Sequence, residues 1–289
     1  DRGNAALRRC ASLSNYLGFP AGIDVETFYG LMHAHVAESG ADSVADTVES
    51  IERIGSIERD VDGEDRSGSD PSADDRSGDA PGFRVETADG VVTARYVIAA
   101  AWYDGSYLRP LCGEAAFERH EHHGEMEERF DPDYPGADGR TPIEGLYVAA
   151  PNGGRNAQAI ISAGQGAHVA RSLLEDHRSS RGFPEGALAA HYDWLRPDSE
   201  FEGEWGDRER WRAWFANEAG EDHGLDDDRF VELREAYVDR AFETRLDEDE
   251  IEERTERGLD RLVETIGAGR VLDAVEDERI REYLATREQ

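Results

Sequence analysis

The chain has 289 residues, of which 65 are acidic and 32 basic, so its formal net charge is −33. Every basic residue counted here is arginine, because the sequence contains no lysine. So large an acidic excess repels nucleic acid and anionic membrane surfaces, and we expect neither as a partner.

The N-terminal segment predicts a loop followed by an amphipathic helix. The loop reads Asn15-Tyr-Leu-Gly-Phe-Pro-Ala-Gly, and Asp24 then stands where a helix N-cap belongs. Apolar side chains follow at helical spacing, at Val25, Phe28, Leu31, Met32 and Val36. We therefore expect a helix that starts after Asp24 and packs one face on a core.

Four strands and one acidic loop are predicted next. Residues 42–51 favour a strand around Val44 and Val48. Residues 60–82 contain Asp-Arg-Ser-Gly twice among Asp, Glu, Ser, Gly and Pro, which is typical of a solvated, disordered loop. Residues 83–94 predict a hairpin that turns at Asp89-Gly90, and the apolar run 96–101 predicts a further strand.

Residues 143–171 carry the strongest functional signal. They predict a short buried strand from Leu146 to Ala150, a glycine-rich turn, and a helix whose first turns are built mainly of Ala, Gly and Ser. Small residues let backbone N–H groups approach a bound ring or anion, and the positive end of the helix dipole favours electron-rich ligand atoms. The pattern indicates a cofactor-binding element. The alternative is a small-residue helix that merely packs on a sheet.

The order of these motifs resembles the FAD-binding domain of thioredoxin-reductase-like flavoproteins, within the FAD-dependent pyridine nucleotide-disulfide oxidoreductases. The resemblance covers residues 1 to about 176. It implies an α/β fold, with a partial Rossmann-like FAD-binding domain (a parallel sheet plus a β-hairpin layer) and an α-helical C-terminal domain. It also places the strand ending at Trp102 beside the strand Leu146 to Ala150 in one parallel sheet.

The same resemblance implies which positions face FAD. They are Asp1 at the adenosine ribose, Asn15 in the flavin-side loop, Val48 at the adenine, Pro151 near the ribityl chain, and Ala157, Gln158 and Ala159 at the pyrimidine edge of the isoalloxazine. No side chain is identified as a catalytic acid, base or nucleophile. His168, inside the small-residue helix, is expected to be packed.

Several departures from the family pattern bear on function. Because no Gly-x-Gly-x-x-Gly occurs, we expect the phosphate loop to lie upstream of Asp1 and the chain to be a fragment of a longer flavoprotein. Leu17 stands where Pro is usual, Ala100-Ala101-Trp102 replaces Ala-Thr-Gly, and Ala150-Pro151 replaces Gly-Asp. The C-x-x-C redox pair is absent, and residues 103–142 are too few for a nicotinamide-binding domain.

The function expected from this resemblance is that of an FAD-dependent oxidoreductase that does not work as a thioredoxin reductase does. The electron donor, for which NAD(P)H is one candidate, the electron acceptor and a homodimeric state are left open. The alternative is a catalytically inactive flavoprotein relic that acts as a binding or assembly subunit. The substitutions at Trp102 and Pro151 favour this alternative.

The C-terminal part predicts helices. Residues 181–204 favour a linker and residues 205–289 an acidic helical domain, which we expect to dock on the α/β part, residues 1–180. Apolar residues recur with a period near 3.6 around Trp211, Tyr237, Leu259 and Tyr283. The tryptophans at positions 194, 205, 211 and 214 are expected to pack in a core or between domains; the alternatives are a lid over the flavin or a partner surface.

A histidine-rich cluster, Arg119-His-Glu-His-His-Gly-Glu125, follows Cys112. These residue types can bind zinc, but a structural zinc site normally has a second ligand pair at a set distance, and the sequence offers none. We expect an exposed acidic loop. Whether His120, His122 and His123 bind a metal is left open.

Composition also predicts the setting. Charge repulsion within so acidic a protein is screened in concentrated salt, because the Debye length falls to about 3 Å at 1 M. Only two cysteines occur, Cys10 and Cys112, which favours a reducing compartment. No run is apolar enough to span a membrane, and the visible N-terminus carries no signal peptide. We therefore expect a salt-rich cytoplasm.

Overall fold

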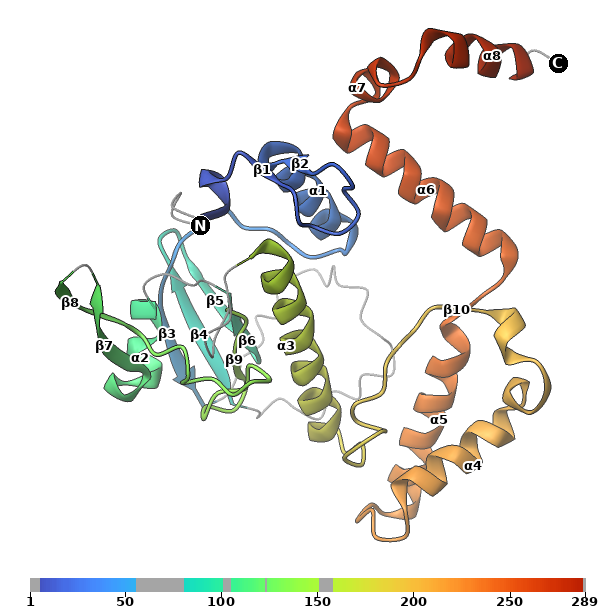
Figure 1. Ribbon diagram of the computed structural model, residues 1–289. Helices are drawn as coiled ribbons and strands as arrows, with labels where there is room; N and C mark the ends of the chain where they lie inside the picture. The colour runs from blue at the N-terminus through green and yellow to red at the C-terminus, as the bar shows by residue number, and fades with distance from the viewer. Residues whose placement is uncertain (1–5, 56–80, 101–104, 123, 151–157, 288–289) are drawn as a thin grey trace. The chain divides into compact units, whose positions relative to one another are not determined.

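The computed structural model describes residues 6–55, 81–100, 105–122, 124–150 and 158–287. Over these residues the chain is a mixed α/β protein, as the predicted fold class requires (Figure 1). It divides into two compact units. The first unit holds the described residues of 45–194 and 201–244, and the second unit holds those of 6–44, 195–200 and 245–287.

The described part of the first unit has three sheets, and two of them form its core. The antiparallel sheet has the order β3 (Val48–Ile54), β4 (Gly82–Thr87) and β5 (Val91–Ala94). The parallel sheet pairs β6 (Val97–Ala99) with β9 (Leu146–Val148), and Val97 lies opposite Leu146. The predicted hairpin and the parallel pairing of these two strands are therefore confirmed, whereas the predicted strand end at Trp102 lies outside the described residues.

One strand begins later than the sequence predicts. Val44 lies ahead of β3 and is 76% exposed, so the prediction of a strand around Val44 is wrong. The partner strand β4 ends at Thr87, opposite Val48, so the residues before Val48 have no strand to pair with in the described part of the chain. They contact the β4–β5 turn instead. The backbone N–H of Asp89 donates to the Asp46 carboxylate at 3.2 Å. Hydrogen bonds to Asp46, of which that from the Thr87 side chain has the largest effect, lower the pKa of this carboxyl and take the place of a sheet ladder.

The core of the first unit joins both sheets. Its fully buried members include Ile51 and Phe83 from the antiparallel sheet and Leu146 and Val148 from the parallel pair. Each such side chain contributes about 1.5–3 kcal/mol when it is removed from water. The hairpin layer and the parallel strands therefore fold as one body.

Two further helices and a hairpin complete this α/β part. Between β6 and β9 the chain forms the short helix α2 (Arg109–Cys112) and the hairpin β7 (Phe117–His122) and β8 (Glu125–Phe130). The histidine-rich segment, expected to be a loop, is thus largely strand. After β9 comes α3 (Ala159–Ser180), which confirms the predicted helix over the residues that the structure describes.

A helix pair, α4 (Arg208–Ala219) and α5 (Asp227–Glu243), belongs to the same unit as the sheets. Its core contains Leu188, Phe215, Leu233 and Tyr237, with Trp211 and Trp214 packed against it. Core packing is confirmed for these two tryptophans and is wrong for Trp194, which is exposed. Residues 181–204, predicted to be a linker, contribute the fully buried Leu188 to this core.

The second unit is mainly helical. Its elements are β1 (Ser12–Leu13), β2 (Ile23–Asp24), α1 (Val25–Glu38), β10 (Arg196–Pro197), β11 (Arg245–Leu246), α6 (Glu248–Ile266), α7 (Ala268–Asp273) and α8 (Asp277–Arg287). Asp24 caps α1 as predicted, and hydrogen bonds from Thr27 lower the pKa of Asp24 to about 2. Asp247 and Glu250 form a capping box at the start of α6. No helix within the described ranges is both long and apolar enough to cross a bilayer.

Candidate functional site

The candidate site lies at the start of α3, beyond the ends of two parallel strands. Gln158 is the N-cap, with an extended backbone (φ −102°, ψ 147°), and its side chain does not cap the helix. The helix begins at Ala159, and its first hydrogen bond runs from the N–H of Ser162 to the carbonyl of Gln158, at 2.9 Å. The backbone N–H groups of the first helical turn, ahead of Ser162, have no acceptor within the helix. They form a partially positive end that suits an electron-rich ligand atom.

Several small residues in the first half of α3 do not pack on the described sheets. Ala163 and Ala167 are exposed, and a Cβ placed on Gly164 or Gly166 would meet nothing within 4 Å. The helix packs through its other face, where Gln165, Val169 and Ser172 are buried. As far as the described residues are concerned, a ring or a further helix therefore has room to lie against the backbone of α3.

The residues predicted to face FAD fall in different places. Asp1, Pro151 and Ala157 lie outside the described residues. Asn15 is an exposed residue of the β1–β2 loop in the second unit, whereas Val48 opens β3 in the first unit. Of the predicted set, the structure brings together Gln158 and Ala159, which form the helix start itself.

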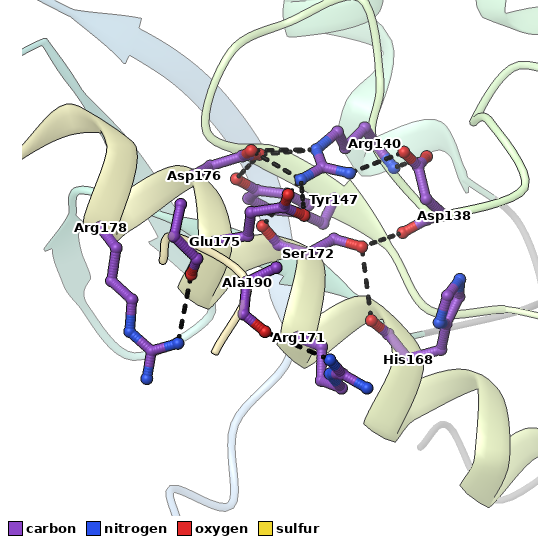
Figure 2. Close-up of polar contacts among 11 residues, drawn as sticks. Asp138, Arg140, Tyr147, His168, Arg171, Ser172, Glu175, Asp176, Arg178 and Ala190 are labelled. Atoms are coloured by element: carbon purple, nitrogen blue, oxygen red, sulfur yellow. Dashed lines mark hydrogen bonds and ion pairs between the residues drawn. The ribbon is translucent and has the colours of Figure 1, made fainter. Parts of the chain in front are cut away.

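His168 differs from its prediction. It is exposed on α3, so the expectation that it is packed is wrong. The buried positions Gln165, Val169 and Ser172 define the face of α3 that meets the sheet, and His168 lies outside that row. Figure 2 shows its carbonyl oxygen accepting a hydrogen bond from the Ser172 hydroxyl, at 3.4 Å.

A polar clamp, which the sequence does not reveal, fastens α3 to β9. We define it as Asp138, Arg140, Tyr147, Ser172, Glu175 and Asp176 (Figure 2). Arg140 donates to both oxygens of Asp176, from Nε to Oδ2 at 2.8 Å and from Nη2 to Oδ1 at 2.7 Å. It also donates to Glu175 at 3.0 Å and to Asp138 at 2.8 Å. The Tyr147 hydroxyl donates to Asp176 at 2.7 Å.

The charged groups of the clamp hold the structure together and do not transfer protons. Burial raises the pKa of Asp138, but hydrogen bonds and charge from Arg140 outweigh it, and the net pKa lies below the ordinary value. Burial and the hydrogen bond that Tyr147 donates to Asp176 raise the pKa of Tyr147. Hydrogen bonds that Arg140 donates, chiefly to Asp176, raise the pKa of Arg140. These groups therefore keep their charges or protons at neutral pH. They position α3 and offer no acid or base.

Gly139 sets how closely α3 approaches the sheet. Its φ of +80° favours glycine, and an added Cβ would stand 2.3 Å from Cγ2 of Val169 and 3.0 Å from the carbonyl oxygen of Val148. The carbonyl of Gly139 also accepts a hydrogen bond from the N–H of Val148, at 2.8 Å. The segment before β9 is thus held between β9 and α3.

The cysteines do not form a redox pair. Cys10 and Cys112 are both free thiols, and burial raises the pKa of Cys112. Tyr134 hydrogen-bonds this thiol, and burial raises the pKa of Tyr134 to about 12. Among the described residues, no three side chains of His, Cys, Asp or Glu gather in a metal-binding group. His123 lies outside these residues, so metal binding by the histidine cluster stays untested.

The comparisons with known proteins add no family. Neither the protein-family models nor the curated proteins contain a match to this chain. The start of α3 and its surroundings are therefore the features from which function is inferred.

Proposed function

We propose that the chain is part of an FAD-dependent oxidoreductase with a thioredoxin-reductase-like, Rossmann-like FAD-binding domain. The observation that carries the proposal is the parallel pairing of β6 with β9 ahead of α3. In open α/β sheets, ligands bind beyond the carboxyl ends of parallel strands and beside helix N-termini. The antiparallel layer β3-β4-β5, in the order that the resemblance implies, supports the same proposal.

The start of α3 suits the isoalloxazine end of FAD. Its N–H groups carry partial positive charge, and Ala159 adds little side-chain bulk. When bound, FAD supplies the electron transfer. The role of the protein is to hold the pyrimidine edge of the isoalloxazine against these N–H groups. They stabilise negative charge on that edge and so favour the reduced cofactor.

The other end of FAD fits the residues present less well. The sequence has no Gly-x-Gly-x-x-Gly to bind a pyrophosphate, and Ala150-Pro151 offers no carboxylate to the ribityl chain. These observations favour a second candidate function, that of a flavoprotein-derived binding or assembly subunit without turnover. The electron donor, NAD(P)H or a reduced protein, and the acceptor are unassigned under the first candidate. Two free cysteines and the acidic composition support a salt-rich cytoplasm.

The first experiment separates the two candidates. The protein is expressed with whatever coding sequence precedes Asp1, purified in molar salt, and examined for flavin absorbance. An oxidoreductase is expected to be yellow, or to become so on reconstitution with FAD. A folded, colourless protein that does not take up FAD contradicts the first candidate and favours the second.

The second experiment tests the site. Ala159→Glu places a negative charge at the start of α3, which stabilises the helix but repels an electron-rich ligand. We expect FAD affinity to fall about tenfold, equivalent to about 1.4 kcal/mol, without loss of folding. Ala159→Gln controls for side-chain size, and Leu174→Glu, at an exposed position of α3, controls for net charge. Equal affinity in Ala159→Glu and Ala159→Gln refutes the assignment of the helix start.

A further inference from the structure

A segment between α3 and α4 folds back on the helices around it. We call residues 188–193 the latch segment. Leu188 and Ala189 are fully buried, and Leu188 packs with Phe215 and Tyr237. Arg178 of α3 donates to the carbonyl of His191 at 2.7 Å. Arg171 donates to that of Ala190 at 3.4 Å (Figure 2), so the segment joins α3 to the α4–α5 pair.

His191 lies at the centre of the latch segment, with an oxygen atom at each ring nitrogen. Nδ1 is 2.7 Å from the carbonyl oxygen of Leu188, and Nε2 is 3.1 Å from Oδ1 of Asp193. A carbonyl and an ionised carboxylate only accept hydrogen bonds, and a neutral imidazole has a single N–H. The doubly protonated ring alone makes both bonds.

Asp193 is held in its ionised form. The hydrogen bond with His191 is the largest cause that lowers the pKa of Asp193; burial opposes it, and the charges of His191, Arg178 and Arg240 add to it. Arg178 donates to Oδ2 of Asp193 at 3.1 Å. The acceptor character of this carboxylate is therefore maintained well below neutral pH.

Charged and titratable groups face His191 from each neighbouring element. Arg178 comes from α3, Arg240 from α5 with its Nε 3.5 Å from Oδ2 of Asp193, and the Tyr237 ring of α5 meets the imidazole edge-on at 5.0 Å. The Asp193 carboxylate is opposite in charge to a doubly protonated ring, and the two arginines have the same charge as that ring. The His191 side chain is 13% exposed, so little water screens this balance.

We propose that His191 is a pH-sensitive latch that fastens residues 188–193 to α3 and α5 when doubly protonated. When a ring proton leaves to solvent, one nitrogen lone pair faces an oxygen lone pair, and the segment loosens. In acid, protonation of Asp193 weakens the same contact from its other side. The latch is closed in the interval between these two protonation events. This inference does not depend on whether the chain binds FAD.

The first test follows the wild-type chain in molar salt. Nuclear magnetic resonance of the imidazole nitrogens reports their protonation as the pH rises from about 5 to 9, the range that spans ordinary histidine titration. Hydrogen exchange is measured at Ala189 and Ala190, whose N–H groups donate to Pro184 and Gly186. With intrinsic rates divided out, we expect exchange at both amides to rise about tenfold as the ring loses its proton. A ring that is singly protonated throughout, or unchanged exchange, overturns the latch.

A pair of variants gives an independent readout. His191→Gln cannot titrate, so exchange at Ala189 and Ala190 should lose its pH dependence. His168→Gln replaces an exposed histidine of α3 and should keep the wild-type response. If His191→Gln keeps the wild-type response, the proposal is wrong. If that variant fails to fold, the wild-type nitrogen measurement still decides.

Discussion

Replacing Arg140 with methionine tests whether the polar clamp holds α3 to β9. The change keeps much of the aliphatic stem but removes the charge shared by Asp138, Glu175 and Asp176. The Arg140 side chain is 33% exposed, so each pair contributes within the roughly 0.2–1 kcal/mol of solvated ion pairs. Three pairs, plus repulsion among the freed carboxylates, give an expected loss of about 2–3 kcal/mol in unfolding free energy.

Urea unfolding at constant molar salt measures this loss. Tryptophan fluorescence is the suitable signal, because the four described tryptophans all belong to the first unit, as Arg140 does. Arg129→Met is the matched control, since Arg129 pairs with Glu118 and is 44% exposed. We expect it to lose about 0.5 kcal/mol or less. If Arg140→Met loses no more than Arg129→Met, the clamp does not stabilise the unit and the reasoning fails.

Three further predictions concern packing, pH and salt. Gly139→Ala should destabilise the first unit by more than about 3 kcal/mol, because the added Cβ meets Val169; Gly186→Ala, with a similar positive φ and open space, should cost only about 1 kcal/mol in the same urea assay. The lowered pKa of Asp193 means that its ionised form stabilises the fold fully above the ordinary value of 3.8 and loses that effect as the pH falls through the folded-state value. Asp193→Asn should therefore be less stable than wild type at pH 6, and the difference should shrink in acid; a constant difference contradicts the assignment. Finally, 65 acidic against 32 basic residues should make folding depend on molar salt, and full ellipticity in dilute buffer contradicts this.

The helices were predictable because their starts are encoded locally. Asp24, Asp226 and Asp247 each accept a hydrogen bond from a backbone N–H three residues later, as N-caps do. Each is followed by apolar side chains at helical spacing. No long-range information is needed to place such helices.

The pairing of β6 with β9 could not be predicted from local sequence pattern alone. Each strand has three residues, and 46 residues lie between Ala99 and Leu146, so propensity alone does not pair them. The motif order of the resemblance supplied the pairing. The resemblance did not predict β7, because the sequence of this strand is mostly charged. Phe117 of β7 packs against Phe130 of β8, with ring centroids 5.8 Å apart.

One part of the candidate site could be predicted from the sequence and the other could not. The start of α3 follows from its glycine-rich turn and small residues. The polar clamp does not, because Arg140 lies 36 residues from Asp176 and such a charge pair resembles any solvated pair in so charged a chain. The latch segment was missed for a similar reason: Phe183-Pro184 and Arg196-Pro197 indicate a linker, and the burial of Leu188 depends on α4 and α5.

The position of the polar clamp along the chain bears on how the protein emerges from the ribosome. All of its members fall between residues 138 and 176, and both strands of the parallel pair precede Ser172. Contacts of short sequence separation form early, because little chain entropy is lost in closing them. The clamp is thus able to close while the helix pair α4–α5 is still being synthesised. Once β6, β9 and α3 are held together by the clamp, α4 and α5 can pack on a surface that is already folded. Variants of Arg140 should therefore lengthen the period in which a nascent chain is open to proteolysis.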